Sequence, residues 1–201
     1  MSEVLVPPTR LPRWVDNFTG RHGQTALTVE GGALTGSAED GSTFAAALPF
    51  GRTYDGSPRA EGVIGECAPP DRWGVLLVRK GGFAIARLHG GVLAESKVGQ
   101  RHVQGRTKAG GQSQQRFARR RDNQARTAYE AAAEHAARIL PRVQCLVTGG
   151  DHSAVEAVLT DRRLSGLVVV PPFLTVPDPR RSVLDQAVLD AGAVRVDVVN
   201  A

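Results

Sequence analysis

Cysteine is scarce in this sequence, and long apolar runs are missing. Cys67 and Cys145 are the two cysteines among 201 residues, far apart and without CxxC spacing. Both are therefore expected to be reduced, and no disulfide framework is predicted. No stretch approaches the roughly 18 apolar residues of a membrane helix, and the segment before residue 12 contains two prolines and an acid, unlike a signal peptide. We expect a cytoplasmic protein with no membrane partner.

Motifs for metal or cofactor binding are also lacking. The histidines show no ligand spacing, and there is no P-loop, serine nucleophile elbow or dinucleotide fingerprint. Two-metal nucleases need converging carboxylates, whereas the predicted strands at 74–79 and 83–88 carry none. Gly149-Gly150-Asp151 is compatible with a phosphate turn, but capping of the next helix by Asp151 is the favoured role. We therefore predict no metal and no cofactor. The histidines are His22, His89, His102, His135 and His152.

The sequence does contain a strongly basic segment. The whole chain has a formal net charge of +5, yet residues 97–126 alone hold nine basic residues and a single acid, Asp122. The remainder of the chain is therefore mildly acidic. A run of one sign, without the interleaved glutamates of an ordinary solvated helix face, indicates contact with nucleic-acid phosphates. The basic residues are Lys97, Arg101, Arg106, Lys108, Arg116, Arg119, Arg120, Arg121 and Arg126.

Residues 1–68 are predicted to form a small β-rich N-terminal region. They are rich in glycine and in short strand-like segments, with a tight hairpin turn expected at Gly31-Gly32. Residues 51–72, rich in Gly, Pro and charge, predict a loop and a domain boundary. The expected strands span 26–29, 33–35 and 43–50, and Trp14, Val15 and Phe18 mark a helical turn.

Residues 69–201 are predicted to form the main α/β domain. Three apolar segments separated by glycine turns indicate an antiparallel meander. A long exposed loop at 99–115 follows, and then a long helix from about 113 to 140. Alternating strands and helices complete a mixed sheet with flanking helices. Its expected strands are 74–79, 83–88, 92–97, 143–147, 167–170 (ended by Pro171-Pro172) and 194–198, and its later helices are 153–159 and 178–191.

A Gly-Gly-Gln tripeptide lies in the predicted loop, at Gly110, Gly111 and Gln112. Alone it is a weak signal, but residues 110–121 read GGQSQQRFARRR. This run resembles, nearly position for position, the segment GGQSxxRFARxR in the middle domain of archaeal and eukaryotic class I release factors. The resemblance implies an RNase-H-like domain in which a loop bearing the tripeptide leads into a long helix. It covers about residues 73–199, with strong identity only at 110–121.

The sequence contains neither the codon-reading domain nor the GTPase-docking domain of those factors. In this it is similar to the Vms-like release factor family, in its stand-alone actinobacterial branch. That resemblance implies codon-independent release of nascent peptides from peptidyl-tRNA on stalled large ribosomal subunits. The partners implied are large-subunit rRNA and peptidyl-tRNA, and we expect a monomer.

The tripeptide suits a peptidyl-tRNA ester hydrolase with water as the nucleophile. Glutamine does not titrate near neutral pH, so it cannot be a general base. The resemblance implies that the Gln112 N–H stabilises the oxyanion or the leaving ribose oxygen, while its side chain orders the water. Gly110 and Gly111 supply unusual φ values and let the backbone enter a narrow RNA-walled channel. The residues expected to bind RNA are Arg101, Arg106, Lys108, Ser113, Arg116, Arg119, Arg120, Arg121 and Arg126.

Three alternatives stay open. Release by cutting the tRNA near its 3′ end would leave a shortened tRNA, and nothing in the sequence excludes it. A non-catalytic ribosome-binding or splitting factor would keep the domain, but relatives of that kind lack the tripeptide that is present here. A generic RNA-binding domain would explain the basic segment but not the glycines.

Overall fold

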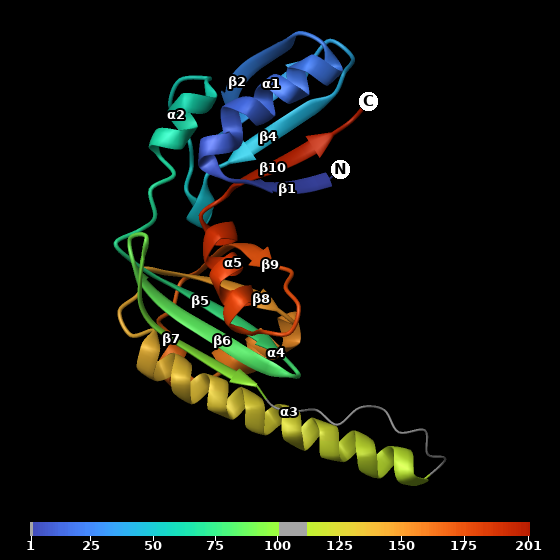
Figure 1. The fold of residues 1–201 in the computed structure, drawn as a ribbon, viewed down its shortest axis with the longest axis vertical. Coiled ribbons are helices and arrows are strands. Elements are labelled where there is room, and N and C mark those ends of the chain that lie inside the picture. The colour runs from blue at the N-terminus through green and yellow to red at the C-terminus, as the bar shows by residue number, and fades with distance from the viewer. Residues whose placement is uncertain (1, 101–111) are drawn as a thin grey trace. The chain divides into compact units, whose positions relative to one another are not determined.

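The structure, a computed structural model, describes residues 2–100 and 112–201, and for residues 112–125 it describes the backbone alone. The chain forms two compact units, each built on a five-stranded sheet (Figure 1). The first unit comprises Met1–Pro69, Val170–Pro172 and Val188–Ala201, and the second comprises Pro70–Val169 and Phe173–Ala187. The predicted α/β class is therefore present.

The first unit holds an antiparallel sheet. Its strands are β1 (Ser2–Val6), β2 (Thr25–Glu30), β3 (Ala33–Ala38), β4 (Thr43–Ala47) and β10 (Val194–Val199), in the order β1-β10-β4-β3-β2. Its helical segments are η1 (Pro8–Arg10), α1 (Leu11–His22), η2 (Pro49–Gly51) and α2 (Ala60–Gly65). The predicted hairpin is confirmed as β2 and β3, where Gly31 and Gly32 have φ of 60° and 78°. Glycine adopts this left-handed backbone at no steric cost.

An aromatic cluster fixes α1 against the first sheet. The ring centroid of Phe44 on β4 lies 5.1 Å from that of Trp14 and 5.0 Å from that of Phe18, both in edge-to-face contact. α1 has twelve residues, whereas the sequence predicted only a single helical turn there. The prediction of a loop throughout 51–72 was incomplete, because α2 forms there and buries Ala60 and Val63. Its glycines weaken the local helix signal, and burial in the core compensates.

The last strand joins the first sheet, so its predicted place in the second sheet was wrong. β10 pairs antiparallel with both β1 and β4, with Val196 opposite Val4 on one side and Ala46 on the other. Val194 and Val196 are fully buried in the core of the first unit. Alternating valines predict a strand with one buried face, but they do not identify the sheet that receives it.

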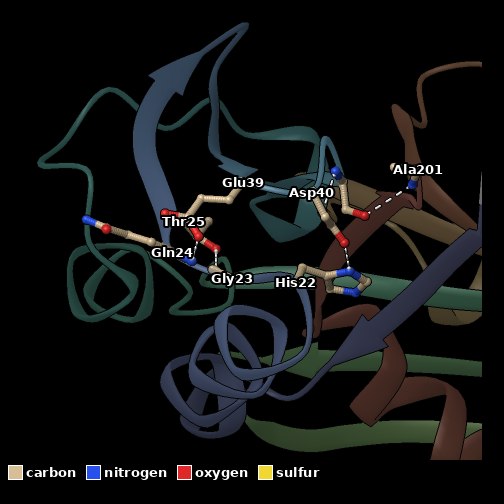
Figure 2. A network of polar contacts seen from close by, with 8 residues as sticks. His22, Gly23, Gln24, Thr25, Glu39, Asp40 and Ala201 are labelled. Carbon is tan, nitrogen blue, oxygen red and sulfur yellow. Dashed lines mark hydrogen bonds and ion pairs between the residues drawn. The ribbon is translucent and has the colours of Figure 1, made fainter.

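A polar network ties three segments of the first unit together (Figure 2). His22 Nδ1, at the end of α1, lies 2.8 Å from Asp40 Oδ2 in the β3–β4 turn. Asp40 Oδ1 accepts the backbone N–H of Ser42 at 2.8 Å, and Ser42 Oγ accepts that of Ala201 at 3.1 Å. The Ser42 N–H, followed by His22, lowers the pKa of Asp40. The residues after β10 are thereby joined to α1 and the β3–β4 turn.

The second sheet is the predicted mixed sheet, and all of it except Val170–Pro172 belongs to the second unit. Its strands are β5 (Arg72–Arg79), β6 (Gly82–His89), β7 (Val92–Gln100), β8 (Cys145–Gly150) and β9 (Val169–Leu174), in the order β7-β6-β5-β8-β9. The meander of β5, β6 and β7 is antiparallel as predicted, and β8 runs parallel to β5. β9 continues through Pro171-Pro172, where the sequence predicted an end. It lies at the sheet edge, where a residue without an N–H is tolerated. The RNase-H-like topology stays a prediction.

A long helix packs on this sheet. The helical segments of the second unit are α3 (Gln112–Ile139), α4 (His152–Leu159) and η3 (Arg162–Leu164). The last helix, α5 (Arg181–Ala191), begins in the second unit, and its residues from Val188 onward belong to the first. The predicted apolar stripe of α3 is confirmed at Ala132, Ala136 and Ile139, which are fully buried against Phe83 and Ile85 of β6. α3 runs along the sheet and continues past it (Figure 1). Within residues 2–100 and 112–201, no helix combines the length and apolarity needed to cross a bilayer.

Candidate functional site

The predicted site spans the connection between β7, which ends at Gln100, and α3, which begins at Gln112. Five of its residues lie outside the described residues: Arg101, Arg106, Lys108, Gly110 and Gly111. Six others lie in the first ten residues of α3, with the backbone described and the side chain not: Gln112, Ser113, Arg116, Arg119, Arg120 and Arg121. Their roles therefore stay predictions.

Arg126 is a predicted RNA-binding residue with a described side chain. Its Nε lies 3.8 Å from Glu130 Oε1, one helical turn later, and both side chains are largely exposed. Exposed pairs at this spacing contribute a few tenths of a kcal/mol. The pair is therefore too weak to keep the guanidinium from a phosphate.

An ion pair joins the last turn of α3 to the edge of the sheet. Arg138 Nη1 donates to Glu95 Oε1 of β7 at 2.6 Å, and Arg87 Nη2 of β6 donates to Glu95 Oε2 at 3.4 Å. Short hydrogen bonds between charged groups are stronger than neutral ones. Residue spacing does not predict this cluster, because Glu95 and Arg138 lie 43 positions apart in the sequence.

The Phe83 side chain joins the end of β7 to α3. Phe83 of β6 is paired with Gly99 of β7, and its ring fills the space that a Gly99 side chain would need. The ring centroid also lies 5.6 Å from that of His135 on α3. Gly99 precedes the last residue of β7, so this contact connects the start of the predicted loop to the helix that follows it.

Arg79 holds two carboxylates at the carboxyl ends of β5 and β8. Its Nε lies 3.4 Å from Asp151 Oδ1 and 3.9 Å from Asp178 Oδ1, and its Nη1 donates to the Val176 carbonyl at 2.9 Å. Asp151 is the N-cap residue of α4, but its carboxylate makes no capping hydrogen bond. The predicted capping was wrong, because Asp151 is oriented toward Arg79 instead. Among the residues described, no three His, Cys, Asp or Glu side chains gather as a metal site would require.

A cavity of about 430 Å³ lies on the first unit. Alanines from β3 and β4 line it, together with two guanidinium groups, Arg52 and Arg195, and two carboxylates, Glu30 and Asp197. Arg195 Nε lies 3.6 Å from Asp197 Oδ2. Both charges of this pair come from β10, so the sequence prediction, which placed that strand elsewhere, could not find the cavity.

Comparisons with known proteins agree with the sequence resemblance. The family model of the Actinobacteria/chloroflexi VLRF1 release factor matches residues 71–197. No curated protein gives a significant match. Among solved structures, an archaeal protein is 12% identical, with 77% of this chain and 50% of that chain covered and a TM-score of 0.37. The crystal structure of Archaeoglobus fulgidus Pelota is 10% identical in sequence, with a TM-score of 0.25. The match covers 94% of this chain and 62% of the Pelota chain.

This chain thus spans half of the archaeal protein and 62% of Pelota. The family match is the more informative finding. It begins just before β5, contains the Gly110-Gly111-Gln112 connection and α3, and ends within β10. Because it covers more than half of the 201 residues, the chain belongs to the Actinobacteria/chloroflexi VLRF1 release factor family.

Proposed function

We propose that this protein is a codon-independent peptidyl-tRNA hydrolase that releases nascent peptides from stalled large ribosomal subunits. The observation that carries the proposal is the release-factor family match over 71–197, which contains Gly110-Gly111-Gln112 between β7 and α3. In this proposal the partners are large-subunit rRNA and peptidyl-tRNA. The protein acts as a cytoplasmic monomer without a metal or cofactor.

The proposed reaction is hydrolysis of the ester between the peptide and the terminal ribose of the tRNA. Water attacks the ester carbonyl carbon, the carbon–oxygen bond to the ribose breaks, and the ribose oxygen takes a proton. Charge develops on the carbonyl oxygen and on the leaving oxygen, where N–H donors are most effective. The Gln112 backbone N–H is proposed as such a donor, and its side chain as the group that orders the water.

The position of Gln112 supports this role. It is the first residue of α3, and the first N–H groups of a helix have no acceptor within the helix. The helix dipole also places partial positive charge at this end, which favours an oxyanion. Gly110 and Gly111 precede it, and in the proposal they let the backbone approach the ester without a clashing Cβ.

The basic residues are proposed to hold the protein on RNA. Arginine and lysine contacts to phosphates position a protein without reading sequence, which suits codon-independent release. Binding should then weaken steeply with salt. The Arg79 contacts favour hydrolysis over a metal-dependent nuclease, because a guanidinium lies between the carboxylates of Asp151 and Asp178.

The test uses stalled large subunits that carry labelled peptidyl-tRNA, incubated with wild type or Gln112→Ala. We expect wild type to release peptide with full-length tRNA. Gln112→Ala keeps the backbone N–H but removes the side chain that orders the water, so it should release peptide about 10²-fold more slowly while still binding. Gln114→Ala is the matched control, since Gln114 lies in the same helical turn but outside the tripeptide. Its rate should stay close to that of wild type.

The products separate this proposal from its alternatives. Sequencing of the tRNA 3′ end distinguishes ester hydrolysis from cleavage of the tRNA, and a shortened tRNA would replace the hydrolase with a nuclease. Binding without release by wild type would leave a non-catalytic ribosome-binding or splitting factor.

A further inference from the structure

We propose that Phe83, Gly99 and the Glu95–Arg138 pair set the angle at which α3 leaves the sheet, and that they are therefore positioning residues for Gln112. The proposal rests on the function proposed above. None of these side chains belongs to the tripeptide or to the predicted RNA-binding set. They act at the opposite end of α3.

The geometry of α3 makes this angle important. Among the α3 residues whose side chains are described, Ala128 is the first that is buried. The sheet therefore holds the helix from Ala128 to Ile139. Gln112 lies sixteen residues earlier, which corresponds to about 24 Å along a helix. A tilt of about 5° at the buried half would move Gln112 by about 2 Å. A misplacement of about 1 Å can cost roughly 10²-fold in rate.

Two contacts on the edge of the sheet control this tilt. Arg138 is bonded to Glu95 of β7, and Glu95 is held in turn by Arg87 of β6. One turn earlier, the His135 ring lies against Phe83. Both contacts face β6 and β7, where the connection to Gln112 begins. β7 therefore has two roles: the connection to Gln112 begins at its end, and its Glu95 orients α3, the helix that follows the connection.

Gly99 is the sensitive point of this arrangement. The Phe83 ring occupies the place of a Gly99 side chain. Separating the strands to make room would break the antiparallel pairing of β6 with β7, in which Phe83 lies opposite Gly99 and Gly82 opposite Gln100. A methyl group on Gly99 would therefore displace the ring. Because protein interiors are close-packed, the displaced ring would push His135 and change the tilt of α3.

The test compares Gly99→Ala with Gly91→Ala, a glycine in the same meander whose Cβ position is open to solvent. Peptide release from stalled large subunits is measured over a range of protein concentrations. Gly99→Ala should slow release at saturation by roughly 10-fold or more, without changing the half-saturating concentration. Gly91→Ala should match wild type. Spin labels at Lys80 and Gln114 report the tilt directly, and their separation should change in Gly99→Ala but not in Gly91→Ala.

Glu95→Gln provides a second variant where Gly99→Ala folds poorly. It keeps the side-chain shape and removes the charge that Arg138 needs, so it should also slow release at saturation and shift the label separation. Phe83→Leu should partly restore release in Gly99→Ala, because the smaller side chain makes room for the methyl group.

The outcomes separate this proposal from the proposed function. Release by wild type that is unchanged in both Gly99→Ala and Glu95→Gln overturns the positioning role and leaves the hydrolase intact. If peptide release falls only in proportion to the loss of thermal stability, and the distance between the spin labels stays unchanged, the positioning role is also overturned. No release by wild type would refute the hydrolase. In that case the positioning proposal is tested by the distance between the two spin labels alone. A distance unchanged in Gly99→Ala and Glu95→Gln would refute control of the helix angle.

Discussion

The two sheets of this protein are assembled in different ways. In the second sheet, β5, β6 and β7 follow one another along the chain and pair as a meander. In the first sheet, β10 is inserted between β1 and β4, although the whole second unit lies between β4 and β10 in the sequence. The meander thus depends on local contacts, whereas the first sheet depends on segments from distant parts of the chain. The two sheets should therefore respond separately to mutation.

The largest expected effect comes from a charge in the middle of the first sheet. Val196 is fully buried in β10, between β1 and β4. Val196→Asp would bury an unpaired carboxylate and should cost about 4 kcal/mol or more. We expect amide hydrogen exchange to show loss of protection in β1, β4 and β10, with β5, β6 and β8 still protected.

The control for this variant lies on the same strand. Val199 is 41% exposed at the end of β10, so Val199→Asp should change stability by no more than about 0.5 kcal/mol. Loss of protection in both sheets of Val196→Asp would contradict separate folding of the two units.

A smaller effect is expected from a cavity in the second unit. Ile139 ends α3 and is fully buried, so Ile139→Ala should cost about 3 kcal/mol in the free energy of unfolding, measured with urea. Protection should fall in the second sheet and persist in the first. Val92→Ala in the same unit is the control, because Val92 is 70% exposed. Equal losses from both variants would argue against the packing of α3 described above.

The smallest expected effect is a pH dependence that comes from Cys67 in the first unit. Burial raises the pKa of the Cys67 thiol from 9.0 to about 11, and its Sγ donates to the Val63 carbonyl at 3.2 Å. The folded unit keeps the thiol protonated, so its contribution is complete below about pH 9 and is lost as the pH rises toward 11. That contribution is on the order of 2 kcal/mol. Cys67→Ala should flatten this decline in urea unfolding measured from pH 8 to 11, and an unchanged slope would refute it.

Much of the fold could be predicted from local signals. Gly31-Gly32 identified the first hairpin, glycine turns identified the meander, and helical spacing identified α3 almost to the residue. The failures have physical causes. The place of β10 depends on pairing with β1 and β4, which no local pattern encodes. β9 continues through its prolines because an edge strand does not need every N–H.

The candidate site, unlike the fold, could be predicted only where its residues are neighbours in the sequence. The run at 110–121 pointed to the family because its motif consists of residues that are consecutive in the sequence. Glu95, Phe83 and Gly99 were missed, because each acts through a partner on another element. A local motif can identify a family, whereas contacts between distant segments are found only in the folded chain.

The insertion of β10 also affects the order of events during translation. β1 to β4 are synthesised early, but their sheet lacks its second strand until α5 and β10 have been made. Through that interval the edges of β1 and β4 that later pair with β10 expose unpaired backbone groups, which invite wrong pairing. The first unit therefore cannot complete its sheet as it emerges, although N-terminal domains usually fold first. The unit that carries the Gly-Gly-Gln tripeptide can complete its meander while the first sheet still lacks β10.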